Sequence, residues 1–158
     1  MSRRACAVAI IAVAGLAGAL GASAFVSSGP HLLVEDLRER RILHRERAGP
    51  GAVFTLDYIH SSERVPVQGT FRIERDGVLT VVETAFAGFG PGLPQLGPGD
   101  DWRLENGMIV HRPQGEPLAG LRVRVTPVAC QRLTTPSGRV LDLAALTTPG
   151  TPILVSVR

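Results

Sequence analysis

The chain has 158 residues and a formal charge of +3, and all 17 of its basic residues are arginine. Its length fits one domain with its own core. Aromatic residues make up only 4% of the chain, so the stacking platforms that bind nucleic acid are scarce. We therefore exclude nucleic acid as a partner.

The first residues read as a targeting segment. Arg3 and Arg4 precede an uncharged run rich in Ala, Val and Leu, which ends in the small-residue triplet Ala22-Ser23-Ala24. This pattern is typical of a secretory signal peptide over residues 1–24. The alternative is an uncleaved membrane anchor over residues 5–28, a run just long enough to span a bilayer. In either case we expect a periplasmic or otherwise extracytoplasmic protein, which touches the membrane only if the segment is uncleaved.

Residues 25–158 are predicted to form a single domain that rests on packing. Loss of the two leader arginines lowers the formal charge from +3 to +1. Cys6 lies in the leader, so no intramolecular disulfide remains for Cys130. Because Cys130 lies in the apolar context VTPVACQRL, we predict a buried and inert thiol there.

This domain reads as all-β from its first segment onward. Residues 32–46 fit either an amphipathic helix or a hairpin, and we predict a hairpin because no other segment is convincingly helical. Apolar and polar side chains alternate in residues 53–60 and again in residues 66–74, which indicates half-buried strands. His60 falls on the apolar side of this alternation.

Asp76-Gly77 predicts a two-residue hairpin turn with positive φ at both positions. Residues 78–86 form the returning strand, which is apolar on both faces and therefore central in its sheet. The register that follows pairs Arg72 with Val81 and Thr70 with Glu83.

Further strands are predicted at residues 102–104, 108–111, 121–126, 140–143 and 153–157. Asn106-Gly107 supplies a second tight turn, between the first two of them. About eight to ten short strands with Gly and Pro turns predict a small antiparallel barrel or sandwich.

Residues 87–101, AGFGPGLPQLGPGDD, interrupt this series of strands. Five glycines and three prolines in this stretch preclude a regular element. The segment matches neither a phosphate loop nor a dinucleotide fingerprint. Long loops inside compact domains are usually functional, although padding is the alternative.

A polar cluster from His60 to Arg64 places an imidazole, two hydroxyls, a carboxylate and a guanidinium in succession. A hydrolase would use Ser61 as nucleophile and His60 as base. Neighbouring strand residues point to opposite faces, however, and Ser61 lacks a nucleophile elbow. The histidines and Asp57 match no zinc pattern, so we expect no metal. A capped turn remains open, as does a binding rim in which Arg64 clamps a carboxylate.

Strand directions predict that the loops at residues 61–65 and 87–101 meet at one end of the domain. We expect the tight Asp76-Gly77 and Asn106-Gly107 turns at the far end, and we therefore predict the loop end as the binding rim. Its candidate residues are His60, Ser61, Glu63, Arg64, Gly90, Gly92, Leu93 and Pro94.

The FTLDYIHS run (residues 54–61), Pro66-Val67, Phe71 and the GFGPGLP loop (residues 88–94) resemble a set of small exported bacterial proteins of unknown function. Those proteins are typically encoded beside TRAP-type solute transporters of the TAXI subclass. The resemblance implies a transporter-associated periplasmic role, with transporter subunits or a small anionic solute as partners. Gln68 departs from the acidic residue usual in that pattern.

From these observations we expect a non-enzymatic accessory or ligand-binding protein without a cofactor. A small periplasmic hydrolase using Ser61 and His60 is one alternative, and a purely structural envelope protein is another.

Overall fold

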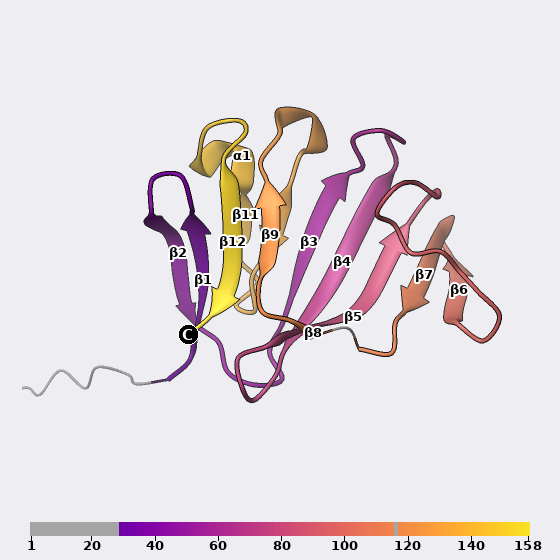
Figure 1. The fold of residues 1–158 in the computed structure, drawn as a ribbon, viewed down its shortest axis with the longest axis horizontal. Helices are drawn as coiled ribbons and strands as arrows, with labels where there is room; N and C mark the ends of the chain where they lie inside the picture. Colours follow the sequence, from indigo (N-terminus) through magenta and orange to yellow (C-terminus); the bar gives the residue numbers. More distant parts are fainter. Residues whose placement is uncertain (1–28, 116) are drawn as a thin grey trace, which may run out of the picture.

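Two antiparallel sheets of unequal size pack face to face (Figure 1). The computed structural model describes residues 29–115 and 117–158. The predicted signal peptide and the alternative anchor at residues 5–28 lie outside these residues. Within the described part, no helix is long and apolar enough to cross a membrane.

The small sheet has four strands in the order β2-β1-β12-β9. These strands are β1 (His31–Asp36), β2 (Arg41–Arg47), β9 (Leu121–Arg124) and β12 (Pro152–Val157). Strands β1 and β12 bury side chains on the face that meets the large sheet. These first and last strands pair with each other at the centre of the small sheet.

The large sheet has eight strands, seven of them in the order β11-β10-β3-β4-β5-β7-β6, with β8 paired beside β5. Its strands are β3 (Val53–Ile59), β4 (Pro66–Ile73), β5 (Leu79–Phe86), β6 (Asp101–Glu105), β7 (Met108–Arg112), β8 (Pro117–Leu118), β10 (Arg132–Thr134) and β11 (Val140–Asp142). Strand β5 lies inside the sheet, as its apolar character predicted. Among the described strands both sheets keep free edges, so the sandwich is confirmed and the barrel alternative is wrong.

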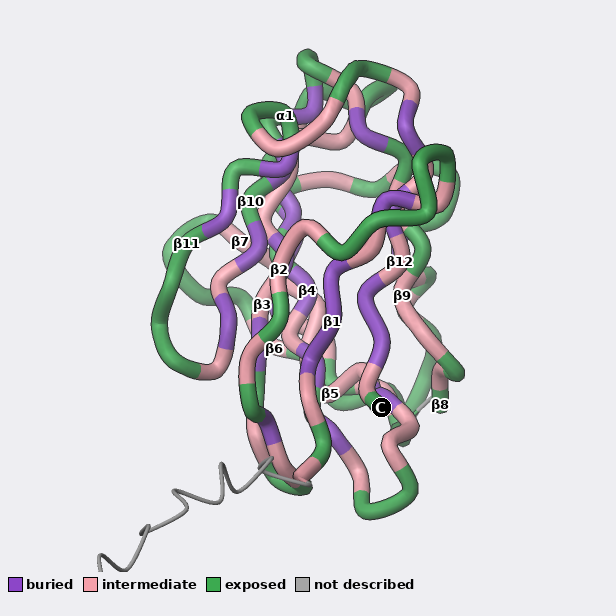
Figure 2. The backbone as a smooth tube through the Cα atoms, turned by 90° about the vertical axis from the view of Figure 1, so that its left-hand side faces the viewer, coloured by how far each residue is buried: buried purple, intermediate pink, exposed green. Residues whose placement is uncertain are grey.

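The core lies between the sheets, where buried stretches of the two layers face one another (Figure 2). Phe54 of β3 and Phe71 of β4 stack with ring centroids 5.0 Å apart. Leu32, Ile153 and their neighbours cover them from the small sheet. Each such side chain contributes about 1.5–3 kcal/mol through burial, and this apolar contact holds the layers together.

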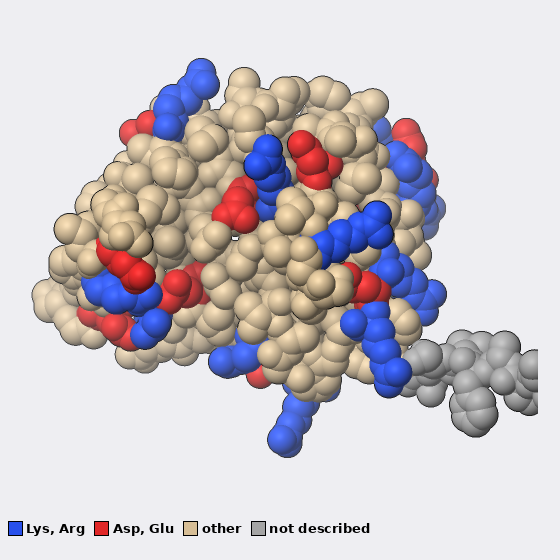
Figure 3. Space-filling model, turned by 180° about the vertical axis from the view of Figure 1, so that it is seen from behind, with Lys and Arg blue, Asp and Glu red and all other residues tan. Residues whose placement is uncertain are grey.

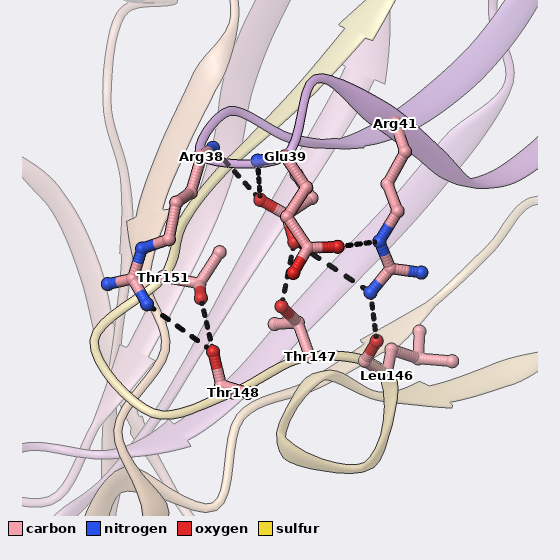
Figure 4. A network of polar contacts seen from close by, with 8 residues as sticks. Arg38, Glu39, Arg41, Leu146, Thr147, Thr148 and Thr151 are labelled. Atoms are coloured by element: carbon pink, nitrogen blue, oxygen red, sulfur yellow. Dashed lines mark hydrogen bonds and ion pairs between the residues drawn. The ribbon is translucent and has the colours of Figure 1, made fainter.

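The ambiguous N-terminal segment is a hairpin, as predicted, and Asp36 explains why. Its side chain is only 1% exposed, and its Oδ1 accepts hydrogen bonds from the backbone N–H groups of Arg38 and Glu39 at 2.9 and 3.0 Å. Such a bond closes a tight turn after a strand and competes with a helix. Oδ2 accepts from the Thr147 hydroxyl at 2.8 Å, which ties the hairpin to the segment before β12 (Figure 4).

The β4–β5 turn differs from its prediction. Gly77 has φ of +80° but Asp76 is not left-handed, and Gly77 donates its N–H to Glu74. This is a three-residue loop with a glycine bulge rather than a two-residue turn. Arg72 therefore pairs with Thr80 instead of Val81, whereas a bulge after Thr70 restores the predicted Thr70–Glu83 pair.

Three short elements between β9 and β12 were not predicted from the sequence. They are β10, the 3-10 turn η1 (Pro127–Ala129) and helix α1 (Leu143–Leu146), which is capped by Asp142. The prediction of a buried Cys130 is wrong, because this residue follows η1 in a left-handed conformation and its side chain is exposed. Ala129, one position earlier, is buried instead.

Candidate functional site

The polar cluster forms the turn between β3 and β4. His60 donates its backbone N–H to Val65 at 2.8 Å and accepts from the N–H of Arg64 at 2.9 Å. Arg64 adopts the left-handed conformation, with φ of +58°, which closes the turn. Ser61, Glu63 and Arg64 are all exposed.

The imidazole of His60 links this turn to the Gly/Pro loop. Its Nε2 lies 3.0 Å from the carbonyl oxygen of Pro91. A carbonyl only accepts, so Nε2 carries the proton and donates. Nδ1 then accepts, with the Ser62 hydroxyl at 3.2 Å and the backbone N–H of Glu63 at 3.4 Å. Both ring nitrogens are thus engaged in holding the two loops together.

Glycine lets these loops approach closely. A Cβ atom at Gly90 would overlap Cγ of Glu63, and a Cβ atom at Gly88 would lie 3.4 Å from Val65. Leu93 is buried against Val67 and Phe86, in a small cluster at this end of the large sheet. The Gly/Pro loop is therefore fixed from both sides, by the turn outside and by apolar contacts inside.

One turn lies elsewhere than predicted. Asn106 and Gly107 have φ of +51° and +77°, the conformation that a two-residue turn requires, but this turn is at the same end as the His60 turn. The reason is that residues 87–100 travel back along the domain before β6 begins, so β6 runs toward the rim rather than away from it. Asp76-Gly77 lies at the far end, beside Val157.

A groove opens between the sheets on the side of β9. The small sheet ends there, while β5, β7 and β6 continue beyond it (Figure 1). The groove has a volume of about 980 Å³. Its walls are the inner face of the large sheet, the edge strand β9 and the Gly/Pro loop, of which Gly92, Leu93 and Pro94 line it.

The opposite side of the sandwich is closed by Glu46 of β2. Its carboxylate accepts hydrogen bonds from the backbone N–H and the hydroxyl of Ser137, at 3.2 and 2.8 Å, across to the β10–β11 turn. Burial alone would raise the pKa of Glu46, but bonds from His44 and Ser137 outweigh it and hold the pKa below its ordinary value. The opening that is large enough for a ligand therefore lies on the β9 side of the domain.

The groove floor contains residues that sequence reasoning did not select. Gly69 lies in the middle of β4, a position where glycine often marks the close approach of another group, and a Cβ atom there would lie 3.0 Å from the Phe71 ring. Thr84 and His111 lie next to it across the sheet. Tyr58 also lines the groove, and burial raises the pKa of its hydroxyl. A glycine inside an alternating strand signals a close approach in the sequence, and here Phe71 makes that approach.

A shallower hollow of about 620 Å³ lies on the outer face of the large sheet. Charged side chains gather at the β6 edge of that face (Figure 3). Glu83 bridges Arg103 and Arg112, at 3.4 and 3.1 Å. The hydrogen bond with Glu105 helps to raise the pKa of Arg103. These charges neutralise one another, so this face offers a solvated ion-pair network.

The predicted site residues thus fall into two groups. His60, Glu63 and Gly90 form the contact between the two loops, whereas Gly92, Leu93 and Pro94 line the groove. Among the described residues no hydrogen bond joins Ser61 to His60, whose hydroxyl partner is Ser62. Nor do the described His, Cys, Asp and Glu side chains form a group of three that could hold a metal ion.

Fold and site together define a β-sandwich with an open inter-sheet groove, which is covered by a Gly/Pro loop that His60 holds in place. The chain belongs to the family described as Domain of unknown function (DUF1850), whose model matches residues 54–143. The match includes both loops and most of the groove floor. No curated protein and no solved structure matches the chain.

Proposed function

We propose that this chain is an exported binding protein without catalytic activity and that its ligand occupies the inter-sheet groove. The groove itself carries the proposal. Its volume of about 980 Å³ lies at the upper end of the roughly 300–1,000 Å³ of small-molecule sites. Its walls combine apolar side chains with a few hydrogen-bonding groups, the composition that such sites have.

In this proposal the protein serves a TRAP-type solute transporter as an accessory factor. Support comes from the His-Ser motif and the Gly/Pro loop, which resemble motifs of proteins encoded beside such transporters. His60 of the first contacts Pro91 of the second, and the Gly/Pro loop lines the groove. The leader-like residues 1–24 support export. The partner is a transporter subunit or a small anionic solute. Loss of transporter-dependent uptake after deletion of the chain is the expected result in cells.

A thermal-shift experiment tests the binding function. Solutes taken up by the neighbouring transporter should raise the melting temperature, since a ligand at a hundred times its Kd stabilises the fold by about 2.7 kcal/mol. Val123→Trp fills the groove from β9 and should abolish the rise. Val128→Trp, at an exposed position of η1, is the matched control and should retain it. A rise that persists in Val123→Trp would place the ligand elsewhere.

The alternatives predict different outcomes of the same experiment. A hydrolase using Ser61 and His60 predicts product formation that Ser61→Ala removes. Because the His60 ring contacts Ser62, Ser62→Ala belongs in the same comparison. A purely structural envelope protein predicts neither product nor thermal shift. A ligand-induced rise without product would favour the binding protein.

A further inference from the structure

The chemistry of the groove changes along its floor. One inward-facing row crosses the large sheet through Leu56, Gly69, Thr84, His111 and Trp102, each paired with the next. The first two are buried, and Trp102 at the other end is 50% exposed. The row therefore passes from an apolar interior to the hydroxyl of Thr84 and the imidazole of His111, which line the groove, and ends at Trp102 beyond the lining.

The wall formed by β9, opposite the floor, also differs between its inner part and its mouth. Leu121 and Val123 of β9 pack against the core, opposite the apolar part of the floor. Near the mouth, Nδ1 of His111 is buried without a hydrogen-bond partner among the described residues. A ligand with an apolar part and a polar part would match both ends of the groove at once.

Charge at the groove favours one sign of polar group. Arg122 and Arg124 border it at the rim formed by the edge strand β9, where they alternate with the inward-facing Leu121 and Val123. Arg124 donates to the carbonyl of Gly150 at 3.1 Å. No ion pair or hydrogen bond joins the Arg122 side chain to another described residue. Asp100 is the carboxylate among the described lining residues, and it already accepts from the N–H of Gly97. Among the lining residues that the structure describes, two guanidinium groups thus outnumber one engaged carboxylate.

We infer that the ligand is an amphipathic organic anion, with its apolar chain between the sheets and its anionic head against Arg122. This inference rests on the proposed binding function and names the ligand class of the same groove. An unengaged arginine offers a planar, bidentate partner to a carboxylate, and the apolar chain removes hydrocarbon from water. A small, fully polar solute would leave the inner part of the groove unfilled.

Trp102 is the only tryptophan of the chain and pairs with His111, which lines the groove, so a change at His111 should alter its fluorescence. The full-length protein should be titrated with decanoate, with 1-decanol and with butyrate. Decanoate should change the emission at low concentration, butyrate should not, and 1-decanol should bind more weakly. Arg122→Gln should weaken decanoate about tenfold, as expected for one lost charge-assisted hydrogen bond, and leave 1-decanol unchanged.

Arg139→Gln is the matched control, because Arg139 is exposed at the β10–β11 turn and does not line the groove. It should bind decanoate like the wild type. Equal decanoate affinity in Arg122→Gln and wild type, or equal affinity for decanoate and 1-decanol, would overturn the inference. If no alkyl probe binds while a transported solute still raises the melting temperature, the ligand class is wrong and the binding function stands. If neither binds, both are wrong.

Discussion

His60 holds two loops together with a single ring. Nε2 donates to Pro91 and Nδ1 accepts from the neighbouring turn, so the imidazole acts as a cross-link between segments about thirty residues apart in the chain. These hydrogen bonds confirm the capped turn, and the binding rim stays a prediction. The His60 ring that caps the turn also holds the Gly/Pro loop in place over the groove.

His60→Ala should therefore loosen the Gly/Pro loop. Loss of the bond to Pro91 should cost about 1 kcal/mol of unfolding free energy, the usual net value of one hydrogen bond. Amide exchange in residues 91–95 should accelerate, and ligand affinity should fall. Ser61→Ala is the control, since Ser61 is exposed, and it should stay within about 0.5 kcal/mol of wild type. Equal effects of the two changes would show that His60 does not hold the Gly/Pro loop in place.

The sequence predicts that His60 and Ser61 point to opposite faces, and the His60 ring indeed contacts Ser62 rather than Ser61. His60 was found because polar residues break an alternating run, and that signal is local. Whether Ser61 or Ser62 faces the ring depends on how the turn curves, and the left-handed Arg64 that sets this curve has no glycine to announce it. Cys130 was misplaced for a similar reason, because a 3-10 turn reversed the chain just before it.

The two hairpin turns show how far the local sequence determines the type of a turn. Asn106-Gly107 forms the two-residue turn that its sequence predicts, with both residues left-handed. Asp76-Gly77 does not, since Asp-Gly also fits the longer turn in which only glycine is left-handed. Strand existence follows from alternation, but the direction of β6 depends on the path of the long loop before it. The register depends on the type of turn and on bulges such as the one after Thr70.

Strand β1 and its turn provide a pH-dependent element. Hydrogen bonds from the backbone N–H of Glu39, the Thr147 hydroxyl and the N–H of Arg38 hold the pKa of Asp36 below its ordinary value of 3.8, although burial opposes them. A lowered pKa contributes stability above the unfolded value, and that contribution is lost as the pH falls through the folded value. The hairpin should therefore weaken below pH 3.8.

Asp36→Asn tests this element by urea unfolding across the acid range. The variant should be less stable than wild type at neutral pH, because the charged acceptor of these hydrogen bonds is gone. The difference should shrink below pH 3.8, where wild-type Asp36 becomes protonated. Parallel pH profiles for the two proteins would show that Asp36 does not titrate as described.

For the molecule as a whole, the groove follows from unequal sheets, of four and eight strands. The sequence predicts an antiparallel all-β domain because alternation and turns are local signals. It does not reveal which strands share a sheet, since β1 pairs with β12 across almost the entire domain. Trp102 and Leu104, 50% and 71% exposed, belong to the edge strand β6 of the larger sheet.

We propose that the ligand binds in the inter-sheet groove and not in the outer hollow. Hydrogen-exchange mass spectrometry, with and without a solute that raises the melting temperature, distinguishes the two places. Residues 92–95 and 121–123 line the groove, whereas residues 105–108 lie at the hollow. We predict that the solute protects the first two segments and leaves the third unchanged. Protection confined to residues 105–108 would contradict the account.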